Sequence, residues 1–220
     1  MAQAPKKKTV LLTPRFRVSF PEVFTKRAFQ EGQPGRYSVV ALFSGFQVVD
    51  GVTKAAAPAN WTQGDKDKWN AILAACNKVA METFKKPMGK LDRGIYKLPY
   101  HRGEEKTYSG YGPGVVYFTL ASTKRRPQIL DRDGNSITAD NSDEFYAGCY
   151  ARASVNPYAF QNIGKGIAIG LGNLQKLDDG DRLDAFTNAE DDFGDSADEY
   201  GADSGDDAMG GGDFEDDPTA

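Results

Sequence analysis

Hydrophobic and polar residues alternate along several short stretches of the chain, with the period of two that β-strands show. Residues 10–20 form the first stretch, and alternation there places one set of side chains in a core and the other outside. The inward set is Phe16, Val18 and Phe20, and the outward set is Arg15, Arg17 and Ser19. Further strands are predicted over residues 36–49, 115–121, 127–130, 136–138, 145–155 and 166–174. Residues 131–135 contain the pair Asp133-Gly134, which predicts a hairpin turn.

Between residues 64 and 86 the apolar residues recur instead at steps of three and four, as on one face of a helix. This stripe consists of Trp69, Ile72, Leu73, Cys76, Val79, Ala80, Thr83 and Phe84. Pro87 and Gly89 then end the predicted helix. Several short strands around a single helix predict a mainly β fold, a small antiparallel β-barrel with one inserted α-helix.

Charge is distributed very unevenly along the chain. Residues 1–177 contain 26 of the 27 Lys and Arg residues and 14 of the 31 Asp and Glu residues, a net charge of +12. Residues 178–220 contain Arg182 and 17 acidic residues, a net charge of −16. A basic body with an acidic tail indicates binding to a polyanion, which the tail would imitate or compete with.

These patterns divide the chain into three parts. Residues 1–8 are predicted to be a disordered basic arm, residues 9–177 a single domain, and residues 178–220 a disordered acidic tail. The apolar runs are too short to cross a membrane, and the lysine-rich N-terminus lacks the apolar segment of a secretory signal. We therefore expect no membrane partner.

Residues suited to catalysis or metal binding are sparse. The two cysteines, Cys76 and Cys149, lie among apolar residues, which favours free buried thiols over a disulfide. With His101 as the one histidine, a structural zinc site is excluded. The glycines of residues 164–172 have neither the dinucleotide-binding nor the Walker A spacing. Carboxylates in a disordered tail lack the fixed geometry of a catalytic site, so we expect neither enzymatic activity nor a cofactor.

Cations and aromatic residues are interleaved in four places, a combination by which proteins bind single-stranded nucleic acid. The predicted phosphate contacts are Arg15, Arg17, Lys124, Arg125, Arg126 and Arg152. The predicted base-stacking residues are Tyr117, Tyr146 and Tyr150, with Tyr96, Tyr100, Tyr108 and Tyr111 of the loop at residues 88–113 as further candidates. Alternation in residues 145–155 places Tyr150 and Arg152 on the same outward face. An ordinary place in the core is the alternative for any single tyrosine.

Five segments carry a resemblance to a known family. They read LPYHR at residues 98–102, PQILDRDGN at 127–135, FYAGCYARASVNPYAF at 145–160, GKGIAIGLGNLQKL at 164–177 and DGDRL at 179–183. These segments resemble bacteriophage single-stranded-DNA-binding proteins of the Enc34 type, a family long described as a domain of unknown function. The resemblance implies an OB-fold core like that of the T7-type phage single-strand binders, with DNA bound through strand faces. It also implies an acidic tail that contacts replication partners and competes with DNA.

Residues and resemblance together lead us to expect a protein that coats single-stranded DNA with little sequence preference. It would act in phage DNA replication or recombination, in the cytoplasm of the infected bacterial host. The alternatives are a module that recruits replication proteins through the acidic tail, binding of RNA or duplex DNA by the same fold, and a nuclease. The oligomeric state is left open.

Overall fold

The computed structural model of the chain describes residues 10–28, 32, 34–162 and 164–183. Within these residues it contains one α-helix, α1 (Gln63–Phe84), and twelve strands. The strands are β1 (Leu11–Leu12), β2 (Phe16–Arg27), β3 (Arg36–Phe43), β4 (Val48–Val49), β5 (Val52–Thr53), β6 (Tyr96–Lys97), β7 (Tyr100–Arg102), β8 (Val116–Ser122), β9 (Ile129–Leu130), β10 (Ser136–Ile137), β11 (Tyr150–Phe160) and β12 (Lys165–Asp178). The predicted basic arm and residues 184–220 of the predicted tail lie outside the described residues.

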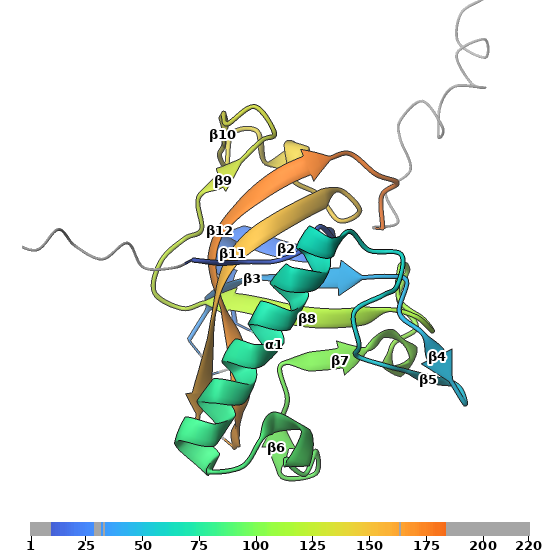
Figure 1. Cartoon of the computed structure of the whole chain (residues 1–220). Helices are drawn as coiled ribbons and strands as arrows, with labels where there is room; N and C mark the ends of the chain where they lie inside the picture. The colour runs from blue at the N-terminus through green and yellow to red at the C-terminus, as the bar shows by residue number, and fades with distance from the viewer. Residues whose placement is uncertain (1–9, 29–31, 33, 163, 184–220) are drawn as a thin grey trace, which may run out of the picture. The chain divides into compact units, whose positions relative to one another are not determined.

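Five of the strands close into a barrel (Figure 1). The order along the ring is β2, β3, β8, β12 and β11, and β11 pairs with β2 to complete it. Four junctions are antiparallel, whereas β8 and β12 are parallel, with Leu120 opposite Ile169. The chain between these two strands passes through β9, β10 and β11, which provides the long crossover that a parallel pair requires. The predicted fold class, a small β-barrel with one inserted helix, is confirmed, with this parallel junction in addition.

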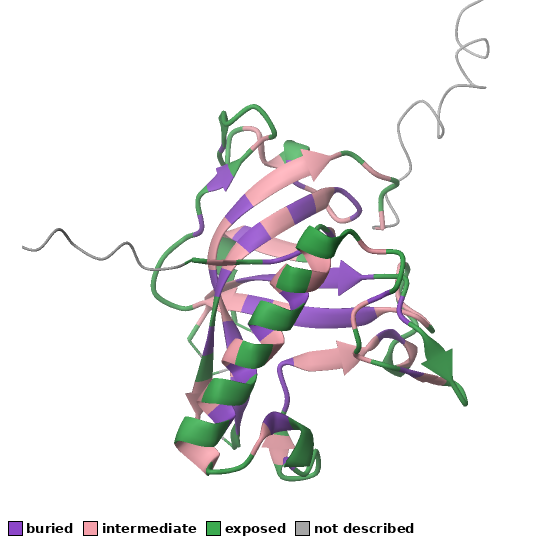
Figure 2. Ribbon diagram, in the orientation of Figure 1, coloured by how far each residue is buried: buried purple, intermediate pink, exposed green. Residues whose placement is uncertain are grey.

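The helix α1 packs against β11 and β1 (Figure 1). It begins at Thr62, whose hydroxyl accepts a hydrogen bond from the amide of Asp65 (3.2 Å) and so satisfies one free N–H of the first turn. The ring of Trp69 stacks on Phe118 of β8, with centroids 4.9 Å apart and planes 6° apart, which joins the helix to the barrel core. Figure 2 shows the buried stripe along α1, and its residues are Trp69, Ile72, Cys76 and Ala80. The predicted helix is therefore confirmed.

Strand β2 departs from simple alternation at its middle. Phe16 and Val18 are buried as predicted, but Ser19 is buried too, and Phe20 is 49% exposed. The prediction of a core position for Phe20 is wrong because its φ is +45° and the register with β3 shifts between Ser19 and Glu22. Such an irregularity turns the following side chains to the other face of the sheet.

Strand β11 begins later than predicted and is followed by a longer β12. Tyr150 and Arg152 share an outward face while Ala151 is buried, as alternation predicts. The strand starts at Tyr150 because Gly148 before it has a φ of +119°, which interrupts the extended backbone. Strand β12 continues to Asp178, so the predicted start of the tail lies within a strand.

The remaining structural predictions concern a turn and the cysteines. Strands β9 and β10 pair around residues 131–135, with Gly134 at a φ of +92°, so the hairpin is confirmed. Cys76 and Cys149 are free and buried, as predicted. In the described part of the chain, no cluster of three or more His, Cys, Asp or Glu residues could bind a metal ion. No helix among those residues has the length and apolar character of a membrane span.

Candidate nucleic-acid interface

The outward side chains of β2, β3 and β8 form one face of the barrel. In β8, Phe118 and Leu120 are buried in the core, so the alternate residues Tyr117 and Thr119 lie on the opposite face. The register sets Val40 of β3 beside Thr119 on this face. A groove of about 550 Å³ runs over it, which we call the aromatic groove. It is lined by Phe20, Glu22, Arg27, Ala28, Val40, His101, Lys106, Tyr108, Tyr111, Tyr117 and Thr119.

Two exposed rings stand at the edge of the aromatic groove. Tyr108 is 54% exposed and contacts the exposed Phe20 edge to face, with ring centroids 5.3 Å apart. Tyr111 contacts Tyr108 in the same manner at 5.8 Å, and its hydroxyl donates to the hydroxyl of Ser19 (3.3 Å). The hydrogen bond fixes Tyr111, while Tyr108 and Phe20 keep accessible ring surface on which a flat ligand can stack.

Tyr117, a predicted base-stacking residue, forms the floor of this groove. Its exposure is 7%, the ring of His101 stacks on it at 5.1 Å, and the ring of Tyr111 meets it edge to face at 5.2 Å. The ring of His101 therefore covers one face of Tyr117. Burial lowers the pKa of His101, and the carboxylate of Glu105, 3.6 Å from Nδ1, opposes that effect. His101 is consequently neutral at neutral pH.

Cations accompany the rings of the aromatic groove. The ammonium of Lys106 lies 6.0 Å from the ring centroid of Tyr108. Arg27, at the end of β2, forms an ion pair with Glu22. The groove thus combines aromatic surface with positive charge along one strand face.

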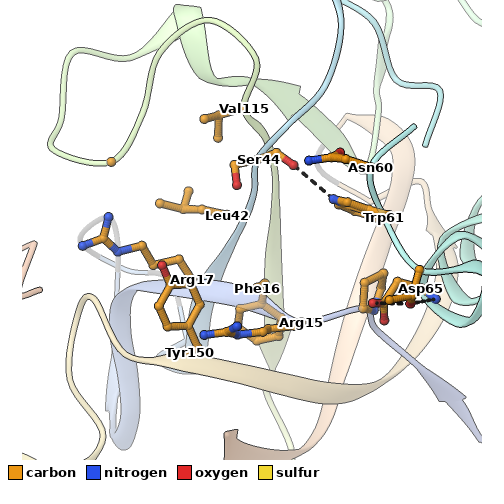
Figure 3. A pocket seen from close by; sticks show the side chains of 13 residues that line it. Arg15, Phe16, Arg17, Leu42, Ser44, Asn60, Trp61, Asp65, Val115 and Tyr150 are labelled. Carbon is orange, nitrogen blue, oxygen red and sulfur yellow. Dashed lines mark hydrogen bonds between the residues drawn. The ribbon is translucent and has the colours of Figure 1, made fainter. Parts of the chain in front are cut away.

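A second groove, of about 380 Å³, brings together three of the predicted contact residues, Arg15, Arg17 and Tyr150 (Figure 3). We call it the arginine groove. The guanidinium of Arg15 lies 3.9 Å from the ring centroid of Tyr150. On the far side Trp61 lines the groove, held by its indole N–H donating to the carbonyl of Ser44 (3.2 Å). The other lining residues are Pro14, Phe16, Leu42, Asn60, Thr62, Asp65, Gly110 and Val115.

Residues 178–183, which we call the C-terminal strap, contact the cations of the arginine groove. The carboxylate of Asp178 pairs with Arg15 (3.2 Å), and Arg17 donates to the carbonyl of Asp181 (2.7 Å). The prediction placed all of these acidic residues in a disordered tail. In the structure they belong to the domain, because their backbone and side chains find partners on β2 and β11.

Other predicted contact residues lie outside both grooves. Tyr146 lies under Arg182 (4.6 Å) and Lys176 (5.5 Å) next to the strap, and Arg152 donates to the side chain of Gln175 (2.9 Å). Near the end of β2 that carries Arg27, Arg126 lies over Phe24 (5.5 Å). The others are Lys124, which is exposed, Arg125, which donates to Asn173 (3.1 Å), Tyr96, which packs on Phe84 (5.0 Å), and Tyr100, which lies under Arg93 (4.9 Å).

Phe20 is the groove residue that the sequence pattern assigned wrongly. Strict alternation from Phe16 points it inward, and only the irregularity in β2 brings it out. One signal for this was present: Pro21 follows it and has no N–H for the sheet ladder, and proline within a sheet marks an edge or a bulge. Lys106 was also missed as a groove residue, because its loop has no periodicity that indicates which way it faces.

Comparison with known proteins identifies the family of the chain. Residues 9–204 match the family model described as the single-stranded-DNA-binding protein of Enterobacter phage Enc34. The chain belongs to this family. A curated relative, putative protein p50 of Acyrthosiphon pisum secondary endosymbiont phage 1, is 41% identical over 85 residues. That match covers 39% of this chain and 43% of the relative, so the chain spans less than half of its length.

Solved structures show the same fold. The single-stranded-DNA-binding protein from bacteriophage Enc34 in complex with ssDNA has a TM-score of 0.59 at 15% identity, covering 79% of this chain and 88% of that one. A second structure of the single-stranded-DNA-binding protein from bacteriophage Enc34 has a TM-score of 0.55 at 15% identity, covering 82% of this chain and 87% of that one. At 15% identity the similarity shows a shared fold.

Proposed function

We propose that this protein binds single-stranded DNA with little sequence preference, along the outer face of β2, β3 and β8. The observation that carries the proposal is the pair of exposed rings, Phe20 and Tyr108, beside cations on that face. OB-folds bind oligonucleotides with this side of the barrel, and stacking on aromatic residues does not depend on base identity. Membership of the phage family supports the same conclusion.

In this proposal the two grooves have different tasks. Bases stack on Tyr108 and Phe20 in the aromatic groove, with His101 as a further ring. Phosphates are neutralised by Arg15 and Arg17 in the arginine groove and by Lys106 in the aromatic groove. The remaining predicted cations, Arg152 and Lys124 to Arg126, lie outside the two grooves and would extend the contact with the DNA strand.

The test compares a fluorescently labelled oligo-dT with RNA and with duplex DNA of equal length. We expect preference for the single-stranded DNA. We also expect log K to fall with log salt at a slope near −3.5 between about 50 and about 200 mM, because about five phosphates at about −0.7 each give that value. Equal or tighter binding of duplex DNA or RNA would contradict the proposal and favour the alternative, a protein of the same fold that binds RNA or duplex DNA. Incubation of the DNA with the protein and Mg²⁺ tests for nuclease activity.

We further propose that the protein acts in phage DNA replication or recombination within the infected host cell. The acidic tail would compete with DNA and dock replication proteins. Its support is the charge of the sequence, −14 over residues 184–220, opposite to that of the body. Deletion of residues 184–220 should tighten DNA binding at low salt, since a tethered competitor is removed. A shortened protein that coats DNA unchanged, but no longer recruits a replication protein, would favour the recruitment module instead.

A further inference from the structure

The C-terminal strap (residues 178–183) is held on the domain by a set of specific contacts. The amide of Leu183 donates to the carbonyl of Ala147 (2.9 Å). The hydroxyl of Tyr146 donates to the carboxylate of Asp179 (2.9 Å) and accepts from the amide of Gly180 (3.2 Å). These bonds tie the strap to the segment that leads into β11. They involve backbone groups, so charge attraction alone does not explain them.

The surface beneath the strap lacks side chains where the strap comes closest. A methyl group on Gly148 would lie 2.1 Å from the carbonyl oxygen of Asp181, closer than atoms can approach. A methyl group on Gly110 would lie 3.0 Å from the side chain of Leu183. Both glycines have positive φ values, which other residues adopt at a cost. The strap therefore packs closely against the domain at these two glycines.

Two carboxylates of the strap form ion pairs with basic side chains of the domain. Asp178 pairs with Arg15 (3.2 Å) and also with Arg132 (3.1 Å), and Asp179 pairs with Lys176 (2.7 Å). The hydrogen bond from Lys176, followed by that from Tyr146, lowers the pKa of Asp179, which keeps this carboxylate charged. The two ion pairs of Asp178 lie at the surface, where such a pair contributes little and is readily exchanged for a phosphate.

The strap also ends where the two grooves meet. Leu183 lies against Gly110, next to Leu42, and both of these residues line the arginine groove. Tyr108 and Tyr111, which stand before and after Gly110 in the chain, line the aromatic groove. A strand that passes from one groove to the other must cross this junction.

We propose that the strap is an autoinhibitory latch that DNA displaces. Closed, it holds Arg15 and Arg17 and separates the arginine groove from the aromatic groove. Open, it frees both arginines, and the two grooves become one continuous track for single-stranded DNA. This inference rests on the proposed function. It differs from competition by the acidic tail, because the latch depends on packing and backbone contacts of residues 178–183.

The latch can be opened in the full chain without any change of charge. Leu183→Ser removes the packing on Gly110, and Tyr146→Phe removes the hydroxyl that holds Asp179 and Gly180 but keeps the ring. Leu130→Ser, on an exposed leucine of β9 that lines neither groove, is the matched control. Both latch variants should bind labelled oligo-dT about fivefold more tightly, the equivalent of one exchanged surface contact. Their salt slope should be steeper by about 1.4, for two more neutralised phosphates.

Hydrogen exchange provides a second measurement. The amide of Leu183, bonded to Ala147, should be protected in the free wild-type protein and should lose protection when oligo-dT binds. Protection that persists in the complex would overturn the latch, as would folded latch variants whose affinity equals or falls below that of the wild type. A wild-type protein with no affinity for oligo-dT would instead overturn the proposed function and the latch with it. The two failures are therefore distinguishable.

Discussion

Replacement of Tyr108 by alanine tests the proposed interface at its most exposed ring. Tyr108 is 54% exposed, and its ring contacts are edge contacts to Phe20 (5.3 Å) and Tyr111 (5.8 Å) at the surface. Its removal should change the free energy of unfolding by no more than about 0.5 kcal/mol, the usual range for a surface position. A lost base–aromatic stack costs about 1–3 kcal/mol. We therefore expect Kd to rise by about 5- to 150-fold.

The assay is fluorescence anisotropy with labelled oligo-dT at low salt, together with a thermal melt of each variant. Tyr158 is the control, because this tyrosine is 43% exposed on β11 and lines neither groove. Tyr158→Ala should leave Kd within about twofold of the wild type. If Tyr108→Ala also stays within that range and melts like the wild type, bases do not stack on Tyr108. The aromatic groove would then lose its role.

Four further outcomes are expected. A fall from about pH 7.5 to about pH 5.5 should strengthen oligo-dT binding, since protonation of His101 adds a cation beside the strand, and His101→Gln should remove this part of the pH dependence in anisotropy titrations. Because the pKa of His101 is lower in the folded protein, the unfolded protein takes up the proton more readily. Without DNA, His101 should therefore lower the free energy of unfolding as the pH falls below about 6.5, which urea melts measure. Burial raises the pKa of Cys76 to about 12 and of Cys149 to about 11, so a thiol reagent at about pH 8 should label neither in the native protein and both after denaturation. Phe118→Ala should lower the free energy of unfolding by about 3–5 kcal/mol in a urea titration, since this fully buried ring stacks on Trp69, and a loss below about 1 kcal/mol would contradict that packing.

The sequence predicted those parts of the fold that depend on regular periodicity. The stripe from Trp69 to Ala80 repeats at helical spacing, and one face of α1 is buried at those positions. The alternation from Tyr150 to Val155 likewise gives the faces of β11. In both, each residue's environment follows from its neighbours in the element, so a local pattern is sufficient. The pairing of β8 with β12 is not local, and no pattern in either strand indicates its parallel direction.

The candidate site was predicted less completely, because it depends on irregular backbone. Alternation places Arg15 and Arg17 correctly on the outer side of the barrel, where they line the arginine groove with Tyr150. It fails at Phe20, since a single residue with positive φ reverses the faces of a strand. Tyr117 lines the aromatic groove, but the ring of His101 that stacks on it comes from β7, which no feature of β8 indicates.

The boundary between domain and tail shows why charge alone misplaces the end of a domain. Residues 178–183 are mostly acidic or glycine, which is the composition of the tail that follows, yet they bond to Ala147 and Arg17 as part of the domain. With the boundary placed after Leu183, the body carries all 27 basic and 17 acidic residues, a net charge of +10. If the latch and the acidic tail both inhibit binding as proposed, a truncation after Leu177 removes both of them, whereas a truncation after Leu183 removes the acidic tail alone. The difference in affinity between the two truncated proteins then measures the latch.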